Sequence, residues 1–322
     1  MAERYKEESH TLEFENKALV PLLFGRHNSH IQYLEDKLGI QIADRGHRLT
    51  LSGRLDRIEA AEAVLRALWS RLQKNQEVSI AEIDAALRFM KNGKHSKNGQ
   101  SMDDPNAVIR TKKKSIIARS PNQALYIQAI QDHPLVFGLG PAGTGQTYLA
   151  VADGAETFLD GAVERMVFCR PAVEAGERLG FLPGDMKDKV DPYLRPIYDA
   201  LQDMLPWDFL VKKMETGEIE IAPLAFMRGR TLSNAFVILD EAQNTTCTQM
   251  KMFLTRMGEA SRMVITGDLT QTDLPSGIKS GLRDAVEILE DVPDVSMIRF
   301  AAADVIRHPL VAKIVHAYDK QK

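Results

Sequence analysis

Short, uniformly apolar runs recur along the C-terminal two-thirds of the chain, with helical stretches between them. Runs of this kind are typical of strands that are buried on both faces of a sheet. Their alternation with helices predicts an α/β fold, a parallel sheet with helices on both faces. We expect strands at residues 135–139, 166–169, 219–222, 236–239, 263–266 and 295–300.

The first 90 residues show a different pattern, which predicts a small α+β domain. We expect strands at residues 10–15, 40–43 and 48–51, short helices at 16–24 and 28–38, and a long amphipathic helix at 57–72. The order β-α-α-β-β-α resembles a KH RNA-binding module, which clamps nucleotide backbone with a G-x-x-G loop between its first two helices. Here that loop reads Gly25-Arg-His-Asn, so the second glycine is missing. We expect Arg26 and His27, and also His30, to contact RNA phosphate. A domain used only for protein contacts is the alternative.

Residues 91–106 are polar and predict a linker, and Lys112-Lys-Lys114 follows between apolar pairs, as in a hairpin with a basic tip. We therefore divide the chain into a KH-like domain (1–90), a linker with a basic hairpin (91–119) and a C-terminal domain (120–322). The alternative interpretation of the three lysines is a solvent-exposed turn without a specific function.

The composition restricts the possible classes of protein but does not identify a ligand. The chain has 322 residues, 44% of them hydrophobic, and a net charge of −3, so any nucleic-acid binding must come from local basic patches. Cys169 and Cys247 lack metal-ligand spacing. There is no signal-peptide pattern and no apolar run of membrane-spanning length, so we expect a cytoplasmic protein.

The strand at residues 135–139 leads into Gly-Pro-Ala-Gly-Thr-Gly-Gln-Thr. This segment matches the phosphate-binding loop motif G-x-x-x-x-G-K-[ST] at every required position except one. Its glycines let backbone N–H groups converge, and the helix that follows offers its N-terminus to an anion. We expect ATP to contact the loop and the start of its helix, at Gly140, Pro141, Ala142, Gly143, Thr144, Gly145, Gln146, Thr147 and Tyr148. The Thr147 hydroxyl would bind Mg²⁺.

Gln146 stands where the motif has lysine. A neutral amide can donate a hydrogen bond to a phosphate, but it brings no positive charge. Losing one preorganised charge costs about 10²–10³ in rate. The sequence therefore predicts nucleotide binding with impaired hydrolysis.

Two further strands end in polar groups. The strand at residues 236–239 is followed by Asp240-Glu241, a Walker B arrangement in which Asp240 would hold Mg²⁺ and Glu241 would activate water. The strand at 263–266 is followed by Gly267-Asp268 and Gln271, which resemble a helicase motif whose glutamine senses the γ-phosphate. Gln123, ahead of the loop, is placed like a glutamine that reads adenine in helicases; an exposed glutamine at a helix start is the alternative.

These motifs, with Cys169-Arg-Pro-Ala-Val-Glu-Ala-Gly-Glu-Arg-Leu-Gly-Phe-Leu-Pro-Gly-Asp and Asp304-Val-Ile-Arg-His-Pro-Leu-Val, resemble the PhoH family, single-domain relatives of superfamily-1 helicases. The resemblance implies a RecA/helicase-like P-loop NTPase, a cytoplasmic ATPase of RNA metabolism that forms a hexameric ring. It also implies a partner in an rRNA-processing endoribonuclease. The chain departs from the family's motif at Gln146, which puts hydrolysis in doubt.

The resemblance also assigns roles to arginines. Residues 170–185 would lie like helicase motif Ia, near the nucleic-acid channel, with Arg170 contacting RNA; a Gly- and Pro-rich surface loop is an equal alternative. Arg307 would act as an arginine finger on a neighbouring subunit, with Arg228 and Arg230 as competitors; an arginine paired to a local acid is the alternative for all three. Little chain follows the last strand, so we expect the finger to come from another subunit.

Two functions remain open. One is an ATP-driven RNA-remodelling enzyme, for which Asp240, Glu241, Gln271 and Arg307 are suited. The other is a nucleotide-binding RNA scaffold without turnover, which Gln146 favours.

Overall fold

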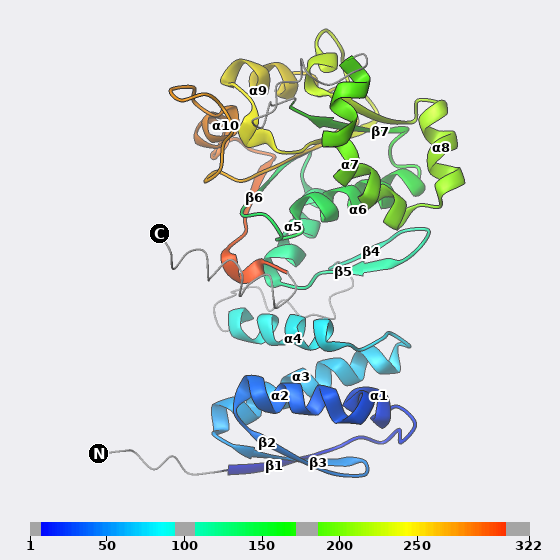
Figure 1. Ribbon diagram of the computed structural model, residues 1–322, viewed down its shortest axis with the longest axis vertical. Helices are drawn as coiled ribbons and strands as arrows, with labels where there is room; N and C mark the ends of the chain where they lie inside the picture. The colour runs from blue at the N-terminus through cyan, green and yellow to red at the C-terminus, as the bar shows by residue number, and fades with distance from the viewer. Residues whose placement is uncertain (1–7, 94–106, 172–185, 307–322) are drawn as a thin grey trace. The chain divides into compact units, whose positions relative to one another are not determined.

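The computed structural model describes residues 8–93, 107–171 and 186–306 (Figure 1). The chain divides into two compact units. The first comprises Met1–Pro105 with Ala118–Pro121, and the second comprises Asn106–Ile117 with Asn122–Lys322. The hairpin of the predicted segment 91–119 is counted with the second unit. No helix in the described ranges is long and apolar enough to cross a membrane.

The N-terminal unit has the predicted order β-α-α-β-β-α, with one helix added. Its elements are β1 (Glu8–Glu13), α1 (Val20–Phe24), the 3₁₀ turn η1 (Arg26–Asn28), α2 (Ser29–Leu38), β2 (Gln41–Arg45), β3 (Arg48–Gly53), α3 (Leu55–Gln73) and α4 (Ile80–Gly93). The strands form an antiparallel sheet in the order β1-β3-β2. Leu49 and Leu51 alternate along β3 and are fully buried, as are Ile58 and Leu65 of α3. The alternate residues of the strand and the residues at helical spacing on α3 are thus buried in the same core.

Helix α4 was not predicted, and part of it lies in the segment that we expected to be a linker. Its start carries a capping signal: the Ser79 hydroxyl accepts a bond from the Ala81 N–H at 3.2 Å, and the Glu82 carboxylate accepts one from the Ser79 N–H at 3.1 Å. Ile83 is buried, and the helix packs on α3. Residues 94–106 of the expected linker lie outside the described ranges.

The C-terminal unit is built around a six-stranded sheet in the order β11-β6-β10-β9-β7-β8, with every pair of neighbours parallel. All six predicted strands are confirmed: β6 (Leu135–Leu139), β7 (Arg165–Arg170), β8 (Ile219–Pro223), β9 (Ala235–Leu239), β10 (Arg262–Gly267) and β11 (Val295–Arg299). The helices are α5 (Pro121–Asp132), α6 (Gln146–Leu159), α7 (Met186–Met204), α8 (Trp207–Glu215), α9 (Cys247–Leu254) and α10 (Gly281–Leu289), with 3₁₀ turns η4 (Leu224–Met227), η5 (Ala242–Asn244) and η6 (Ala302–Asp304).

Helices cover both faces of this sheet, as predicted. Met250 and Phe253 of α9 share a core cluster with Phe137, Val237 and alternate residues of the other strands. On the opposite face α6 approaches closely, since a Cβ at Gly154 would lie 2.8 Å from the Phe236 ring. The strand interiors are therefore buried on both sides, which explains their uniformly apolar sequences. The predicted α/β P-loop fold is confirmed.

The basic hairpin is present as β4 (Val108–Arg110) and β5 (Ser115–Ile117), but its lysines make specific contacts. The ammonium of Lys113 donates to the carbonyl of Gln202 at 2.6 Å, near the C-terminus of α7, where the helix dipole favours cations. Lys112 lies over the ring of Phe209, 3.5 Å from its centroid, and Lys114 pairs with Asp203. The predicted hairpin with an exposed basic tip is present, and its lysines also have specific partners on α7 and α8.

Candidate nucleotide site

The phosphate loop joins the buried strand β6 to the N-terminus of α6 (Figure 1). Gly143 and Gly145 have φ values of 91° and 83°, in the left-handed region that glycine enters without strain. Thr144 between them is fully buried, and its hydroxyl donates to the Pro141 carbonyl at 3.0 Å. The loop is thus a compact turn that ends at a helix N-terminus, as an anion site requires.

Neighbouring segments hold the loop from outside. The side-chain amide of Gln123 donates to the Thr144 carbonyl at 2.8 Å, and the Ile306 N–H donates to the Gly143 carbonyl at 2.8 Å. Gln123 is 3% exposed, so the alternative of an exposed helix-start glutamine is wrong. Its predicted contact with adenine stays a prediction.

Asp240 and two hydroxyls meet directly beside the loop. The carboxylate oxygen Oδ1 of Asp240 accepts a bond from Thr147 at 2.7 Å and one from Thr266 at 2.8 Å. Asp240 is 5% exposed at the end of β9, and β10 lies between β9 and the loop strand β6. One carboxylate, one hydroxyl and ligand phosphates are the donors that Mg²⁺ usually takes in nucleotide sites. The residues present therefore fit this ion.

The side chain of Gln146 is folded into the loop. Its amide nitrogen donates to the Gly140 carbonyl at 3.2 Å. Its oxygen Oε1 is buried without a hydrogen-bond partner among the described residues. A buried carbonyl oxygen offers nothing to an ionised phosphate, which also has only acceptors. The position therefore supplies one neutral donor at most.

Glu241 directly follows Asp240 and adopts a left-handed backbone, with φ 54° and ψ 38°. This conformation is uncommon for a residue other than glycine and typically costs about 1–3 kcal/mol. Its two carboxylate oxygens have different partners: Arg170 lies 2.9 Å from Oε1, and the Gln243 amide donates to Oε2. The predicted general base is thus held on both sides.

Gln243 is a residue whose role the sequence did not indicate. Besides its bond to Glu241, its oxygen Oε1 accepts the Asp268 N–H at 3.2 Å, so it links the ends of β9 and β10. Gly267 leaves room for it, because a Cβ there would lie 2.6 Å from that oxygen. Its place three residues after Asp240, in the same motif, was the available signal. Gln271, the predicted γ-phosphate sensor, is exposed beyond β10, and its role stays a prediction.

Tyr148, the second residue after Gln146, bonds through its hydroxyl to a residue outside the loop. The hydroxyl donates to Asp203 at 2.6 Å, and Lys114 pairs with the same carboxylate. Hydrogen bonds from Lys114 and then Tyr148 lower the pKa of Asp203, whereas burial and the Asp203 bond raise the pKa of Tyr148. This cluster ties the start of α6 to the basic hairpin and the end of α7.

The three arginines considered as fingers have different surroundings. Arg230 makes two hydrogen bonds of 2.7 Å to the carboxylate of Glu220. It therefore fits the alternative interpretation, an arginine paired to a local acid. Arg228 is exposed. Arg307 lies outside the described residues, so its assignment stays a prediction.

Comparison with known proteins decides the family. The sequence model of a family described as "PhoH-like protein" matches residues 115–319. The PhoH-like protein of Bacillus subtilis is 49% identical over 299 residues, which cover 93% of this chain and 93% of the relative. The chain belongs to the PhoH family. With the loop geometry, this makes it a P-loop ATP-binding protein.

Other PhoH relatives cover different shares of the chain. A PhoH-like protein of Mycobacterium tuberculosis (strain ATCC 25618 / H37Rv) is 45% identical over 302 residues, 93% of this chain and 85% of the relative. Protein PhoH of Escherichia coli (strain K12) is 47% identical over 205 residues, 63% of this chain and 58% of the relative. A match over 93% of the chain includes most of the N-terminal unit.

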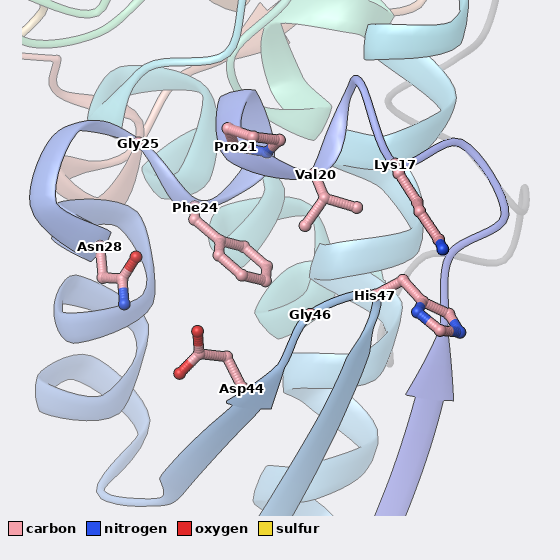
Figure 2. A pocket seen from close by; sticks show the side chains of 9 residues that line it. All are labelled: Lys17, Val20, Pro21, Phe24, Gly25, Asn28, Asp44, Gly46 and His47. Atoms are coloured by element: carbon pink, nitrogen blue, oxygen red, sulfur yellow. The ribbon is translucent and has the colours of Figure 1, made fainter.

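In this PhoH-family chain a second candidate site lies in that N-terminal unit. A pocket of about 470 Å³ opens between α1, the loop after it and the β2–β3 turn. Figure 2 shows Lys17 and His47 at one end of the pocket, Asn28 and Asp44 at the other, and the Phe24 ring between them. An apolar floor with polar groups at both ends has the general character of a ligand site.

The loop beside this pocket keeps a turn without its second glycine. Asn28, at that position, has φ 59° and ψ 24°, a left-handed conformation that asparagine tolerates better than most residues. Arg26 and His27 are exposed on the loop, as phosphate contact would require. His30 is not available: it is 8% exposed, and its ring nitrogen bonds with the Leu23 carbonyl at 3.0 Å. The expectation for His30 is therefore wrong.

Proposed function

We propose that this protein binds ATP with Mg²⁺, hydrolyses it slowly, and couples the nucleotide cycle to RNA binding or remodelling. The observation that carries the proposal is the contact of Thr147 with Asp240, 2.7 Å, at the N-terminus of the loop helix. It brings the two predicted metal ligands together where the β- and γ-phosphates would lie.

Each residue has a distinct part in this proposal. The loop N–H groups bind the phosphates, and Thr147 and Asp240 hold the ion. When bound, Mg²⁺ supplies charge that offsets the negative charge on the transferred phosphoryl group. Glu241 orients the attacking water and accepts its proton, and Gln271 senses the γ-phosphate.

The RNA contact belongs to the N-terminal unit and its pocket. Arg26 and His27 would bind backbone phosphate, and the apolar floor around Phe24 would accept a base. The family resemblance supports a hexameric ring with Arg307 as the finger, and an rRNA-processing endoribonuclease as partner. A cytoplasmic location remains a prediction.

One observation favours a second function, a nucleotide-binding RNA scaffold without turnover. Gln146 offers no charge, and its buried Oε1 opposes phosphate in its present orientation. The loop, Thr147 and Asp240 could then hold ATP as a structural ligand.

The deciding experiment measures ATP binding by calorimetry with and without Mg²⁺, and ATP hydrolysis with and without single-stranded RNA. The chain and its Gln146→Lys variant are compared. Mg²⁺-dependent binding by both, with RNA-stimulated turnover rising in the variant, supports the first function. Binding without turnover in both supports the scaffold, and no ATP binding contradicts both.

A further inference from the structure

Arg170 occupies a position that its predicted RNA-binding role does not explain. It ends β7, the strand next to β9, and the register pairs Cys169 with Leu239. Arg170 is therefore level with Asp240, the residue after Leu239. Its guanidinium lies 2.9 Å from Oε1 of Glu241 and 3.9 Å from Oδ2 of Asp240.

This ion pair acts on the group that should activate water. Oε1 of Glu241 faces Arg170, and Oε2 accepts the Gln243 amide. A carboxylate held at both oxygens has less freedom to accept a proton from water. The left-handed backbone of Glu241, φ 54°, shows that the surroundings hold the residue in a costly conformation.

We propose that Arg170 is a positioning residue that keeps Glu241 in a resting arrangement, and that a ligand phosphate frees Glu241 by competing for the guanidinium. The proposal rests on the proposed function. Arginine binds phosphate and carboxylate through the same planar set of donors, so the two anions are direct competitors.

Two phosphates could act as the competitor. The Arg170 side chain is 18% exposed, so solvent reaches it. The contacts of Asp240 with Thr147 and Arg170 place the arginine on the same sheet edge as the loop. A γ-phosphate bound by the loop would lie on that edge. An RNA backbone phosphate is the other source of the same chemistry.

A double-mutant cycle in ligand affinity tests the competition without needing turnover. The parent chain, Glu241→Gln, Arg170→Gln and the double variant are titrated with a non-hydrolysable ATP analogue plus Mg²⁺, with ADP plus Mg²⁺, and with a single-stranded RNA oligonucleotide. We expect Glu241→Gln to tighten binding of the competing ligand about three- to tenfold. In the Arg170→Gln background the same change should have no effect.

Two further variants separate this role from a structural one. Arg170→Lys keeps the charge but loses the planar fork, so it should retain a reduced coupling. Glu220→Gln is the matched control, because it weakens the Arg230–Glu220 pair through the same change of side chain. It should leave all three affinities unchanged.

Coupling with the analogue but not with ADP or RNA assigns release to the γ-phosphate, and coupling with RNA assigns it to nucleic acid. An equal effect of Glu241→Gln with and without Arg170, or no effect on any ligand, overturns the proposal. Binding is measured directly, so a chain that binds ATP without turnover still tests it. A chain that binds none of the ligands overturns this proposal and the proposed function together.

Discussion

The hydroxyl of Thr147 donates to the carboxylate of Asp240 across 2.7 Å, although 93 positions separate the two residues in the chain. The loop strand and the Asp240 strand are not neighbours, since β10 lies between them. Thr266, from the end of β10, donates to the same oxygen at 2.8 Å. Three parallel strands thus deliver their carboxyl ends to one point, where ligands bind in open α/β sheets.

Restoring a lysine at position 146 should speed hydrolysis. Gln146→Lys adds one positive charge where the transition state is most negative, so we expect the rate of ATP hydrolysis to rise about 10²-fold or more. Steady-state phosphate release measures it. Gln146→Met, which removes the amide without adding charge, is the control and should not raise the rate. Equal rates for the parent chain and the Gln146→Lys variant would show that this position does not limit hydrolysis.

Substitutions at Glu241 and Asp240 should have different effects, one on hydrolysis and the other on metal binding. In the Gln146→Lys background, Glu241→Gln should lower turnover roughly 10²-fold or more without weakening ATP binding, because Glu241 acts on water. Asp240→Asn should instead remove the Mg²⁺ dependence of binding. Calorimetry with and without Mg²⁺ distinguishes them. A loss of binding in Glu241→Gln would make Glu241 a metal ligand and reverse the assigned roles.

The strands and the acidic motif could be predicted because both are local patterns. A strand buried on both faces must be apolar throughout, and polar residues at its end must face the ligand edge. The ion pair of Arg170 with Glu241 could not be predicted, because it depends on β7 and β9 being neighbours. The contacts of Lys113 with α7 depend on tertiary packing in the same way. Helix α4 is different: the Ser79–Glu82 signal was present in the sequence.

Asp153 of α6 should make the stability of the C-terminal unit depend on pH. Burial, and then the charge of Glu156, raises the pKa of Asp153 to about 7. Its folded pKa therefore exceeds 3.8, the usual value of an aspartate carboxyl, and the folded state holds the proton more tightly. This contribution to stability is complete below pH 3.8 and is lost as pH rises to about 7, by at most about 1.4 kcal/mol per pH unit.

Asp153→Asn should remove this loss. The free energy of unfolding of the variant minus that of the parent should therefore increase between pH 5 and 7 and stay constant above about pH 8. Urea unfolding followed by Trp207 fluorescence measures it, in a Trp69→Phe parent that leaves one tryptophan reporter in the C-terminal unit. A pH-independent difference for Asp153→Asn would show that ionising the buried carboxyl does not lower the stability of the folded state.

The N-terminal loop should carry part of the RNA affinity. Because the chain has a net charge of −3, RNA phosphates must be bound by local cations, and affinity should fall steeply with salt. Arg26→Ala should weaken binding and reduce the slope of log K against log salt by about one. Fluorescence anisotropy over a salt series measures it. Arg66→Ala, an exposed arginine on α3 that pairs with Glu62, is the control. Unchanged affinity and slope for Arg26→Ala would place the RNA contact elsewhere.

The last prediction concerns a site shared between subunits. If Arg307 completes the site of a neighbour, contacts between subunits must be head-to-tail, and such contacts close into rings when the rotation permits. In the Gln146→Lys background, Glu241→Gln and Arg307→Ala chains should each be nearly inactive. An equal mixture should regain activity, because random assembly gives about a quarter of interfaces both an intact Glu241 and an intact Arg307. Phosphate release after subunit exchange measures the regain, and mixing Glu241→Gln with itself is the control. No regain in a mixture that demonstrably exchanges subunits would assign the arginine to its own chain, and a strictly monomeric protein with ATP bound would remove the ring altogether.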